Sequence, residues 1–167
     1  MNATANRRPR ALLLDDDPTV LGILGSALEA RGFDVLAATD GDSGVALLID
    51  ELLRLDVVVA DDALPVRDAP SLLRLIRCKG GERDLGLVVL GDGSPTSREQ
   101  LIALGADEVV DRRRGPAVAA DAVVSVLRRR DRGTGAAPDP APPAWRSALL
   151  AARAALAPGS ALDPAPA

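Results

Sequence analysis

Two apolar runs that each end in aspartates constrain the fold of this chain more than any other feature. Residues 12–14 are three leucines followed by Asp15–Asp17, and residues 57–60 are Val-Val-Val-Ala followed by Asp61 and Asp62. A run that is apolar throughout predicts a strand covered on both faces, as in a parallel sheet. Carboxylates crowded at one strand end repel one another, and proteins usually neutralise such clusters with a cation, often a divalent metal. We therefore expect the two strand ends to meet and form one acidic pocket.

The rest of the stretch between residues 10 and 130 alternates strand-like and helix-like segments. Short apolar segments predict five strands, at residues 12–14, 34–39, 55–60, 85–90 and 107–110. Each is followed by apolar residues at helical spacing, and helices are expected to begin near Pro18, Asp40, Pro70, Ser94 and Gly115. This alternation predicts βαβ units and an α/β fold, a doubly wound five-stranded parallel sheet with helices on both faces. Ligands of such folds bind beyond the carboxyl ends of the strands, where the aspartates lie.

Composition and charge exclude several kinds of chemistry. The sequence has 167 residues, no histidine and one cysteine, Cys78. It therefore has no histidine base or ligand, and it cannot form an intramolecular disulfide or a cysteine zinc site. The net charge of −4 gives no overall attraction to nucleic acid. Because no apolar run approaches a membrane span and residues 1–10 lack the apolar stretch of a signal peptide, we expect a cytoplasmic protein that contacts neither nucleic acid nor membrane directly.

One folded domain with short appendages is expected. The parts are an N-terminal tail, the domain, a linker rich in Pro, Ala and Gly, a candidate C-terminal helix and a disordered tail, at residues 1–9, 10–130, 131–143, 144–157 and 158–167. In the candidate helix, Trp145, Leu149 and Leu156 share one stripe. This stripe could pack on the domain or on a partner, but a short alanine-rich helix is marginal alone. We expect no output domain in these remaining residues.

Four features in register make residues 10–130 resemble the receiver domain of bacterial two-component response regulators. The acidic residues 15–17 are similar to the family's acidic pair after its first strand. Residues 61–65, Asp-Asp-Ala-Leu-Pro, match the family's phosphoacceptor spacing of Asp, two residues, Leu or Met, then Pro. Residues 105–107 resemble the family's Gly-Ala-Asp before its fifth strand, and the order of elements agrees. The resemblance implies a flavodoxin-like or CheY-like sheet with strand order 2-1-3-4-5.

The resemblance also implies a role for each residue of the acidic pocket. Asp61 would accept a phosphoryl group from a histidine kinase; Asp62 is its rival, but the spacing to Pro65 favours Asp61. The implied cofactor is Mg²⁺ or another divalent cation, held by the side chains of Asp16 and Asp61, by Asp15 through water, and by the backbone carbonyl of Ala63. Mg²⁺ prefers such oxygen ligands together with water and phosphate oxygens. It would also screen the carboxylates so that an anionic phosphoryl group can approach.

Three positions depart from the family's pattern. Gly91 aligns with a Thr or Ser whose hydroxyl contacts the phosphoryl group, and Val109 aligns with an aromatic switch residue. Arg112 aligns with a Lys, and the two side chains differ in shape and hydration. Residues 112–114 fit a solvated basic turn and a phosphate-facing role equally well. Since phosphorylation normally shifts a two-state equilibrium, these departures predict a module that is poorly switched by phosphate or fixed in one state.

Our interpretation is a single-domain receiver in two-component phosphorelay signalling, with Asp61 as its acceptor and protein–protein contacts as its output. Its partners would be a sensor histidine kinase or phosphotransfer protein and a downstream protein. It would not be an enzyme beyond catalysing its own phosphorylation. One alternative is a pseudo-receiver that acts as an interaction domain without phosphorylation. A second is a metal-dependent phosphate-ester hydrolase, since Asp15 and Asp17 have the offset of a nucleophile and an acid.

Overall fold

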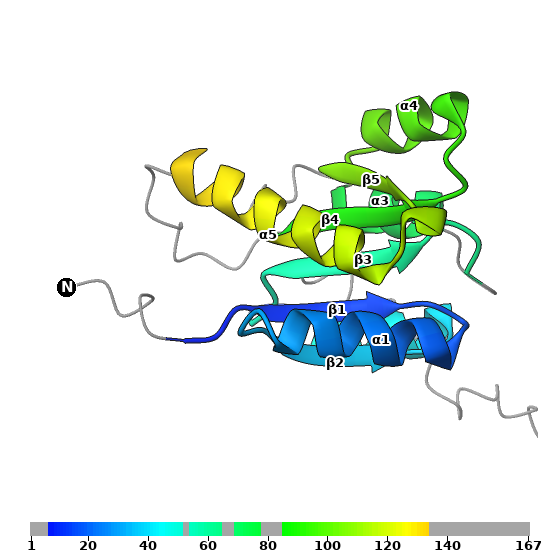
Figure 1. Cartoon of the computed structure of the whole chain (residues 1–167). Coiled ribbons are helices and arrows are strands. Elements are labelled where there is room, and N and C mark those ends of the chain that lie inside the picture. The colour runs from blue at the N-terminus through cyan, green and yellow to red at the C-terminus, as the bar shows by residue number, and fades with distance from the viewer. Residues whose placement is uncertain (1–6, 52–53, 65–68, 78–84, 134–167) are drawn as a thin grey trace, which may run out of the picture.

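Five parallel strands form the centre of the molecule, and helices cover both faces of the sheet (Figure 1). The structure is a computed structural model that describes residues 7–51, 54–64, 69–77 and 85–133. The elements in these residues are β1 (Arg10–Leu14), α1 (Pro18–Glu29), β2 (Asp34–Ala38), α2 (Gly41–Glu51), β3 (Val57–Asp61), α3 (Ala69–Arg77), β4 (Gly86–Gly91), α4 (Pro95–Ala103), β5 (Glu108–Asp111), the 3₁₀ turn η1 (Arg112–Arg114) and α5 (Pro116–Gly133). The strand order is β2-β1-β3-β4-β5, which confirms the predicted doubly wound α/β fold.

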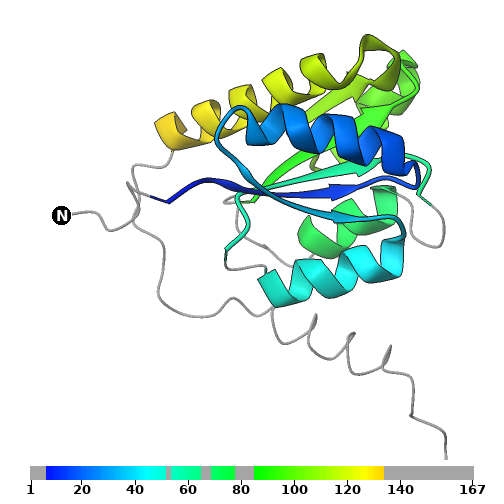
Figure 2. The same cartoon turned by 60° about the horizontal axis from the view of Figure 1, so that its bottom comes forward.

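Two hydrophobic clusters cover the two faces of the sheet. Successive strand residues point to opposite faces, so that Leu12 and Val58 lie in one cluster and Leu13 and Val59 in the other. The helices α2, α3 and α4 pack on the first cluster, and α1 and α5 pack on the second (Figure 2). Burial on both faces is the physical reason why these strands are apolar throughout.

Aspartate side chains begin two of the helices, as their positions before helical segments predict. The Asp17 carboxylate accepts the N–H of Thr19 at 2.8 Å, directly before Pro18 in the first turn of α1. The Asp40 carboxylate accepts the N–H of Ser43 at 2.8 Å at the start of α2. These backbone hydrogen bonds hold the pKa of both aspartates below its usual value. Asp17 is therefore a capping residue, and its carboxylate is bonded to the first turn of α1.

Some element boundaries differ from the sequence-based prediction. β3 and β5 each end one residue later than predicted, because parallel pairing continues to Asp61 and Asp111. α5 continues to Gly133, so the expected linker at residues 131–143 begins inside a helix. No proline interrupts this helix before Gly133, and arginines near its end complement the helix dipole. The candidate helix 144–157, together with Pro65, Cys78, residues 1–6 and 158–167, lies outside the described residues.

Gly44 lies where α2 packs closely against β1. A Cβ atom at this position would lie 2.5 Å from Cδ2 and 3.3 Å from Cδ1 of Leu14. Leu14 is 2% exposed, so it cannot move aside without displacing its neighbours. We expect Gly44→Ala to lower the free energy of unfolding by about 1–2 kcal/mol, measured by urea denaturation.

The matched control is Gly22→Ala, in the interior of α1. A Cβ atom at Gly22 meets nothing within 4 Å. Because alanine favours the helical conformation over glycine, this variant should be about 0.5–1 kcal/mol more stable than the parent. Equal gains in stability for Gly44→Ala and Gly22→Ala would contradict the close approach of α2 to β1.

Candidate functional site

The acidic residues of β1 and β3 meet at the carboxyl edge of the sheet. Leu14 and Ala60 are partners in the parallel pairing of these strands. Asp15 follows Leu14 directly, and Asp61 follows Ala60 as the last residue of β3. Asp15 is 7% and Asp61 2% exposed, which makes them the buried carboxylates of the described residues. The two strand ends therefore form one acidic pocket, as expected from the sequence.

Burial raises the pKa of both carboxylates. For Asp15, desolvation outweighs the N–H of Asp17, which donates to Asp15 Oδ1 at 2.9 Å, and the negative charge of Asp61 raises the pKa further. For Asp61, desolvation outweighs the lowering effect of Arg112. Each charged carboxylate thus opposes folding at neutral pH, and a cation near either one would be favourable.

Arg112 supplies positive charge to this pocket. It lies in η1, directly after β5, and its Nη2 donates to Asp61 Oδ1 and, at 2.5 Å, to Asp62 Oδ1. Burial lowers the pKa of Arg112, but the two carboxylates outweigh this and raise it. The sequence left open whether residues 112–114 form a solvated basic turn or face a phosphoryl group. The Arg112 side chain points to the acidic residues where that group would lie. Arg113 instead pairs with Asp111 at 2.8 Å at the surface.

Gly91 ends β4 beside this ion pair. A Cβ atom at Gly91 would lie 3.2 Å from Val109 Cγ1 and 3.7 Å from Asp62 Oδ2. The Asp62 carboxylate thus borders the space that a side chain at position 91 would enter. Sequence reasoning treated Asp62 only as the rival of Asp61 and missed its contact with Arg112. The combination of a second aspartate, a glycine in place of a hydroxyl residue and an arginine in place of lysine is the signal in the sequence that could have revealed this contact.

The predicted metal ligands lie along the same edge of the sheet. The Asp16 side chain is exposed and lines the same cavity as Asp15, and the backbone N–H of Ala63 donates to Asp61. No group of three or more acidic or cysteine side chains that could hold a metal occurs in residues 7–51, 54–64, 69–77 and 85–133. Mg²⁺ commonly uses one or two carboxylates with water and phosphate oxygens. Asp15 and Asp61, two buried carboxylates at one edge, fit that requirement.

Two cavities adjoin the acidic edge. One, of about 340 Å³, lies between the start of α1, η1 and the start of α5, and it includes Asp15, Asp16 and Arg112 in its lining. The other, of about 570 Å³, lies between α3 and α4, and Asp62 reaches its edge. Asp62 therefore contacts Arg112 of the acidic pocket and also lines the cavity between α3 and α4.

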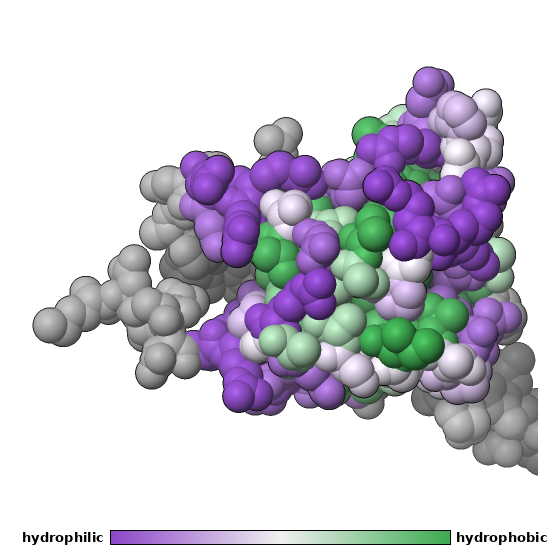
Figure 3. Space-filling model, in the orientation of Figure 1, coloured by the Kyte–Doolittle hydropathy of each residue, from purple (hydrophilic) through white to green (hydrophobic). Residues whose placement is uncertain are grey.

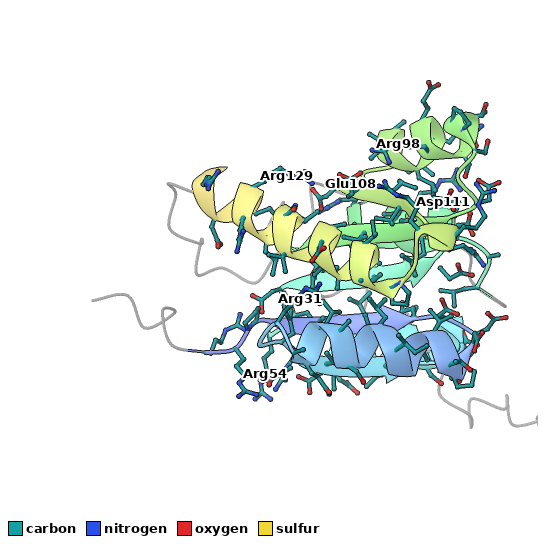
Figure 4. The ribbon with its side chains drawn as sticks, viewed as in Figure 1. Arg31, Arg54, Arg98, Glu108, Asp111 and Arg129 are labelled. Carbon is teal, nitrogen blue, oxygen red and sulfur yellow. The ribbon has the colours of Figure 1, made fainter. Side chains whose placement is uncertain are left out.

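Arginines bridge the elements α4, β5 and α5 on one side of the molecule (Figure 4). Arg98 of α4 donates to Glu108 of β5 at 2.7 Å and also to the backbone carbonyl of Val109. Arg129 of α5 donates to the other Glu108 oxygen at 3.4 Å. Burial raises the pKa of Glu108, but Arg98 and Arg129 outweigh this and hold it below its usual value. Contacts to the backbone of Val109 thus tie α4 to the strand that ends at η1.

The outer face of α1 and α5 has a different character from the arginine-rich side. Figure 3 shows hydrophobic residues over these helices with hydrophilic residues around them. Ile23 of α1 is 54% exposed, and Val20 and Ala27 of the same helix are half-buried. Arg31, shortly after the end of α1, forms a salt bridge of 2.7 Å with Asp121 of α5. Of the helices that the structure describes, none combines the length and apolar character needed to cross a bilayer.

The strand order and the acidic carboxyl edge define the class as a doubly wound, CheY-like α/β domain. The response regulator receiver domain family matches residues 11–123, and the chain belongs to this family, as the resemblance in the sequence implied. The family is one of signalling domains rather than of enzymes.

Related proteins agree with this assignment. The DNA-binding dual master transcriptional regulator RpaA of Synechocystis is 31% identical over 125 residues, which are 74% of this chain and 51% of RpaA. The chain spans about half the length of the first curated relatives it matches.

Two solved structures are similar in fold. The response regulator receiver domain protein from Clostridium thermocellum has a TM-score of 0.67 at 21% identity, over 75% of this chain and 99% of that one. The CheX–CheY–BeF₃–Mg²⁺ complex from Borrelia burgdorferi has a TM-score of 0.64 at 17% identity, over 76% and 95%. At these identities the similarity concerns the fold alone.

Proposed function

We propose that this receiver accepts a phosphoryl group on Asp61 and transmits the signal through protein–protein contacts. The observation that carries the proposal is the placement of Asp61: it is a buried carboxylate at the end of β3, with Asp15 beside it and Arg112 bonded to its Oδ1. A desolvated carboxylate that is charged is a better nucleophile than a hydrated one, because it needs to shed fewer waters before attack.

The proposed reaction is transfer of a phosphoryl group from a phosphorylated histidine. An Asp61 oxygen attacks phosphorus, the P–N bond breaks, and its electron pair stays on the imidazole of the donor. Arg112, which binds the Asp61 carboxylate before the reaction, can bind the phosphoryl oxygens after it. A guanidinium is well suited to this change because it forms strong hydrogen bonds with both carboxylates and phosphates. A bound Mg²⁺, with Asp15 through water, Asp16, Asp61 and the Ala63 carbonyl as its ligands, would add positive charge at the transferring group.

The proposed partners follow from the same chemistry. Upstream, a sensor histidine kinase or phosphotransfer protein would supply the phosphoryl group to the acidic edge. Downstream, a protein would recognise the face of α4, β5 and α5, where Glu108 joins Arg98 to Arg129. The Borrelia complex, whose description includes BeF₃ and Mg²⁺, supports a divalent cation at such a site. DNA binding is a property of RpaA, of which this chain matches about half.

A second candidate function is a pseudo-receiver that binds its partner without phosphorylation. The contacts of Arg112 with Asp61 and Asp62 favour it, because they neutralise the acceptor within the chain itself. Gly91 favours it as well, since no hydroxyl at this position would hold a phosphoryl group. The two candidates differ in one measurable property, the phosphorylation of Asp61.

Incubation with a small acyl phosphate and Mg²⁺, followed by intact-mass measurement, tests the proposal. We expect the mass of one phosphoryl group to be added to the parent chain and to Asp62→Asn, and to be absent from Asp61→Asn. Loss of the label only in Asp62→Asn would identify the rival aspartate as the acceptor. No label on the parent at any donor concentration would favour the pseudo-receiver. Turnover of a generic phosphate ester that persists in Asp61→Asn would instead indicate the hydrolase alternative.

A further inference from the structure

We propose that Asp62 controls the phosphorylation of Asp61 by competing for Arg112. This inference rests on the proposed function and adds a positioning residue to it. Asp62 does not form the new bond; its carboxylate binds the guanidinium that a phosphoryl group on Asp61 would need. Asp62 would therefore compete with the incoming phosphoryl group for the Arg112 guanidinium.

The first observation is the sharing of a single nitrogen. Arg112 Nη2 donates both to Asp61 Oδ1 and, at 2.5 Å, to Asp62 Oδ1. The Asp61 side chain is 3% exposed and that of Asp62 is 18% exposed, whereas that of Arg112 is 44% exposed, so the two ion pairs are partly shielded from water on their carboxylate side. In such surroundings an ion pair is stronger than at an open surface. Breaking the contact of Arg112 with Asp61 would therefore leave Arg112 bonded to Asp62.

The second observation is the space over Gly91. The nearest polar atom to a Cβ built at this position is Asp62 Oδ2, at 3.7 Å. A hydroxyl side chain here would extend toward the region that the Asp62 carboxylate borders. Asp62 therefore joins these positions into one unit: its Oδ1 binds Arg112, and its Oδ2 borders position 91.

Phosphorylation brings a second anion into this unit. The phosphoryl oxygens on Asp61 would lie near the Asp62 carboxylate and would be repelled by it. They would also compete with Asp62 for Arg112. Arg113, the next cation in η1, is paired with Asp111: its Nε donates to Asp111 Oδ1 and its Nη2 donates to Asp111 Oδ2. Competition by Asp62 should therefore slow the formation of the phosphorylated state and hasten its loss.

The test compares the parent with Asp62→Asn, which keeps the shape and removes the charge. With a small acyl phosphate and Mg²⁺, we expect Asp62→Asn to gain the Asp61 label about fivefold faster than the parent, because one repelling charge is removed and Arg112 is released. After removal of the donor, the variant should lose the label severalfold more slowly. A merely structural role for Asp62 would not change the two rates in opposite directions.

Two further variants serve as controls. Asp62→Glu restores a carboxylate and should label at nearly the rate of the parent. Asp92→Asn removes an exposed aspartate from the same edge of the sheet and should leave both rates unchanged. Equal rates of gain and loss in the parent and Asp62→Asn would overturn this inference and leave the proposed function intact. Absence of label on both proteins would overturn the proposed function, and the inference with it.

Discussion

Replacement of Asp107 by alanine is expected to lower the free energy of unfolding by about 3 kcal/mol, because it breaks a half-buried charge network. Asp107 precedes β5, and its carboxylate accepts hydrogen bonds from Arg77 of α3 at 3.0 Å and from Arg130 of α5 at 2.7 Å. It also accepts the backbone N–H of Leu87 in β4 at 2.8 Å. At the amino edge of the sheet, the Asp107 side chain thus joins two helices that lie on opposite faces. Removing this side chain takes away the carboxylate that Arg77 and Arg130 share.

Urea denaturation followed by circular dichroism measures this effect. The matched control is Asp121→Ala, which removes the partner of Arg31 in a salt bridge whose aspartate side chain is 70% exposed. Exposed pairs of this kind contribute little, so the control should lose no more than about 0.5 kcal/mol. Similar losses in the two variants would show that the Asp107 network adds nothing beyond an ordinary surface pair.

Replacement of Arg112 by alanine is expected to make the stability of the domain depend on Mg²⁺. Without Arg112, the buried Asp61 and its neighbours Asp15 and Asp62 lose the cation bonded at this edge. In the presence of a chelator we expect the free energy of unfolding to fall by about 2 kcal/mol, less than for a fully buried pair because the Arg112 side chain is 44% exposed. Mg²⁺ should recover much of this loss, since a cation that binds only the folded state stabilises it.

The pH dependence of the Arg112→Ala variant follows from the raised pKa of Asp61. A carboxylate whose pKa is higher in the folded than in the unfolded state opposes folding when it is charged. As the pH falls through the raised pKa, Asp61 takes up a proton and this penalty disappears. Removing Arg112 takes away a lowering influence, so the pKa rises further. The stability deficit of the variant should therefore be largest near neutral pH and shrink toward acidic pH.

Thermal unfolding with and without Mg²⁺, across this pH range, tests the role of Arg112. Arg113→Ala is the matched control, because Arg113 is the next residue in η1, its side chain is 73% exposed and its salt bridge is with Asp111. It should show neither the Mg²⁺ dependence nor the recovery in acid. If the two variants behave alike, Arg112 is not the counter-ion of the acidic pocket.

Much of the fold was predictable because its signals are local. Apolar runs such as residues 57–60 predict buried strands through their pattern alone, and Asp17 before Pro18 predicts a helix start through backbone hydrogen bonding. Boundaries were less predictable, because strand ends depend on pairing with a neighbour. Asp61 belongs to β3 since Leu90 of β4 continues the ladder opposite it.

The sequence by itself determined which carboxylates gather at the carboxyl edge, because parallel strands place their ends side by side and Asp15 and Asp61 each follow an apolar run. Only the tertiary structure decided what neutralises them. Arg112 is distant in sequence from Asp61. Whether its side chain is solvated or faces the pocket depended on where β5 ends and on how far the guanidinium reaches. The contact with Asp62 depended further on the pairing of β3 with β4 and of β4 with β5, which brings the end of β3 and η1 to the same edge of the sheet.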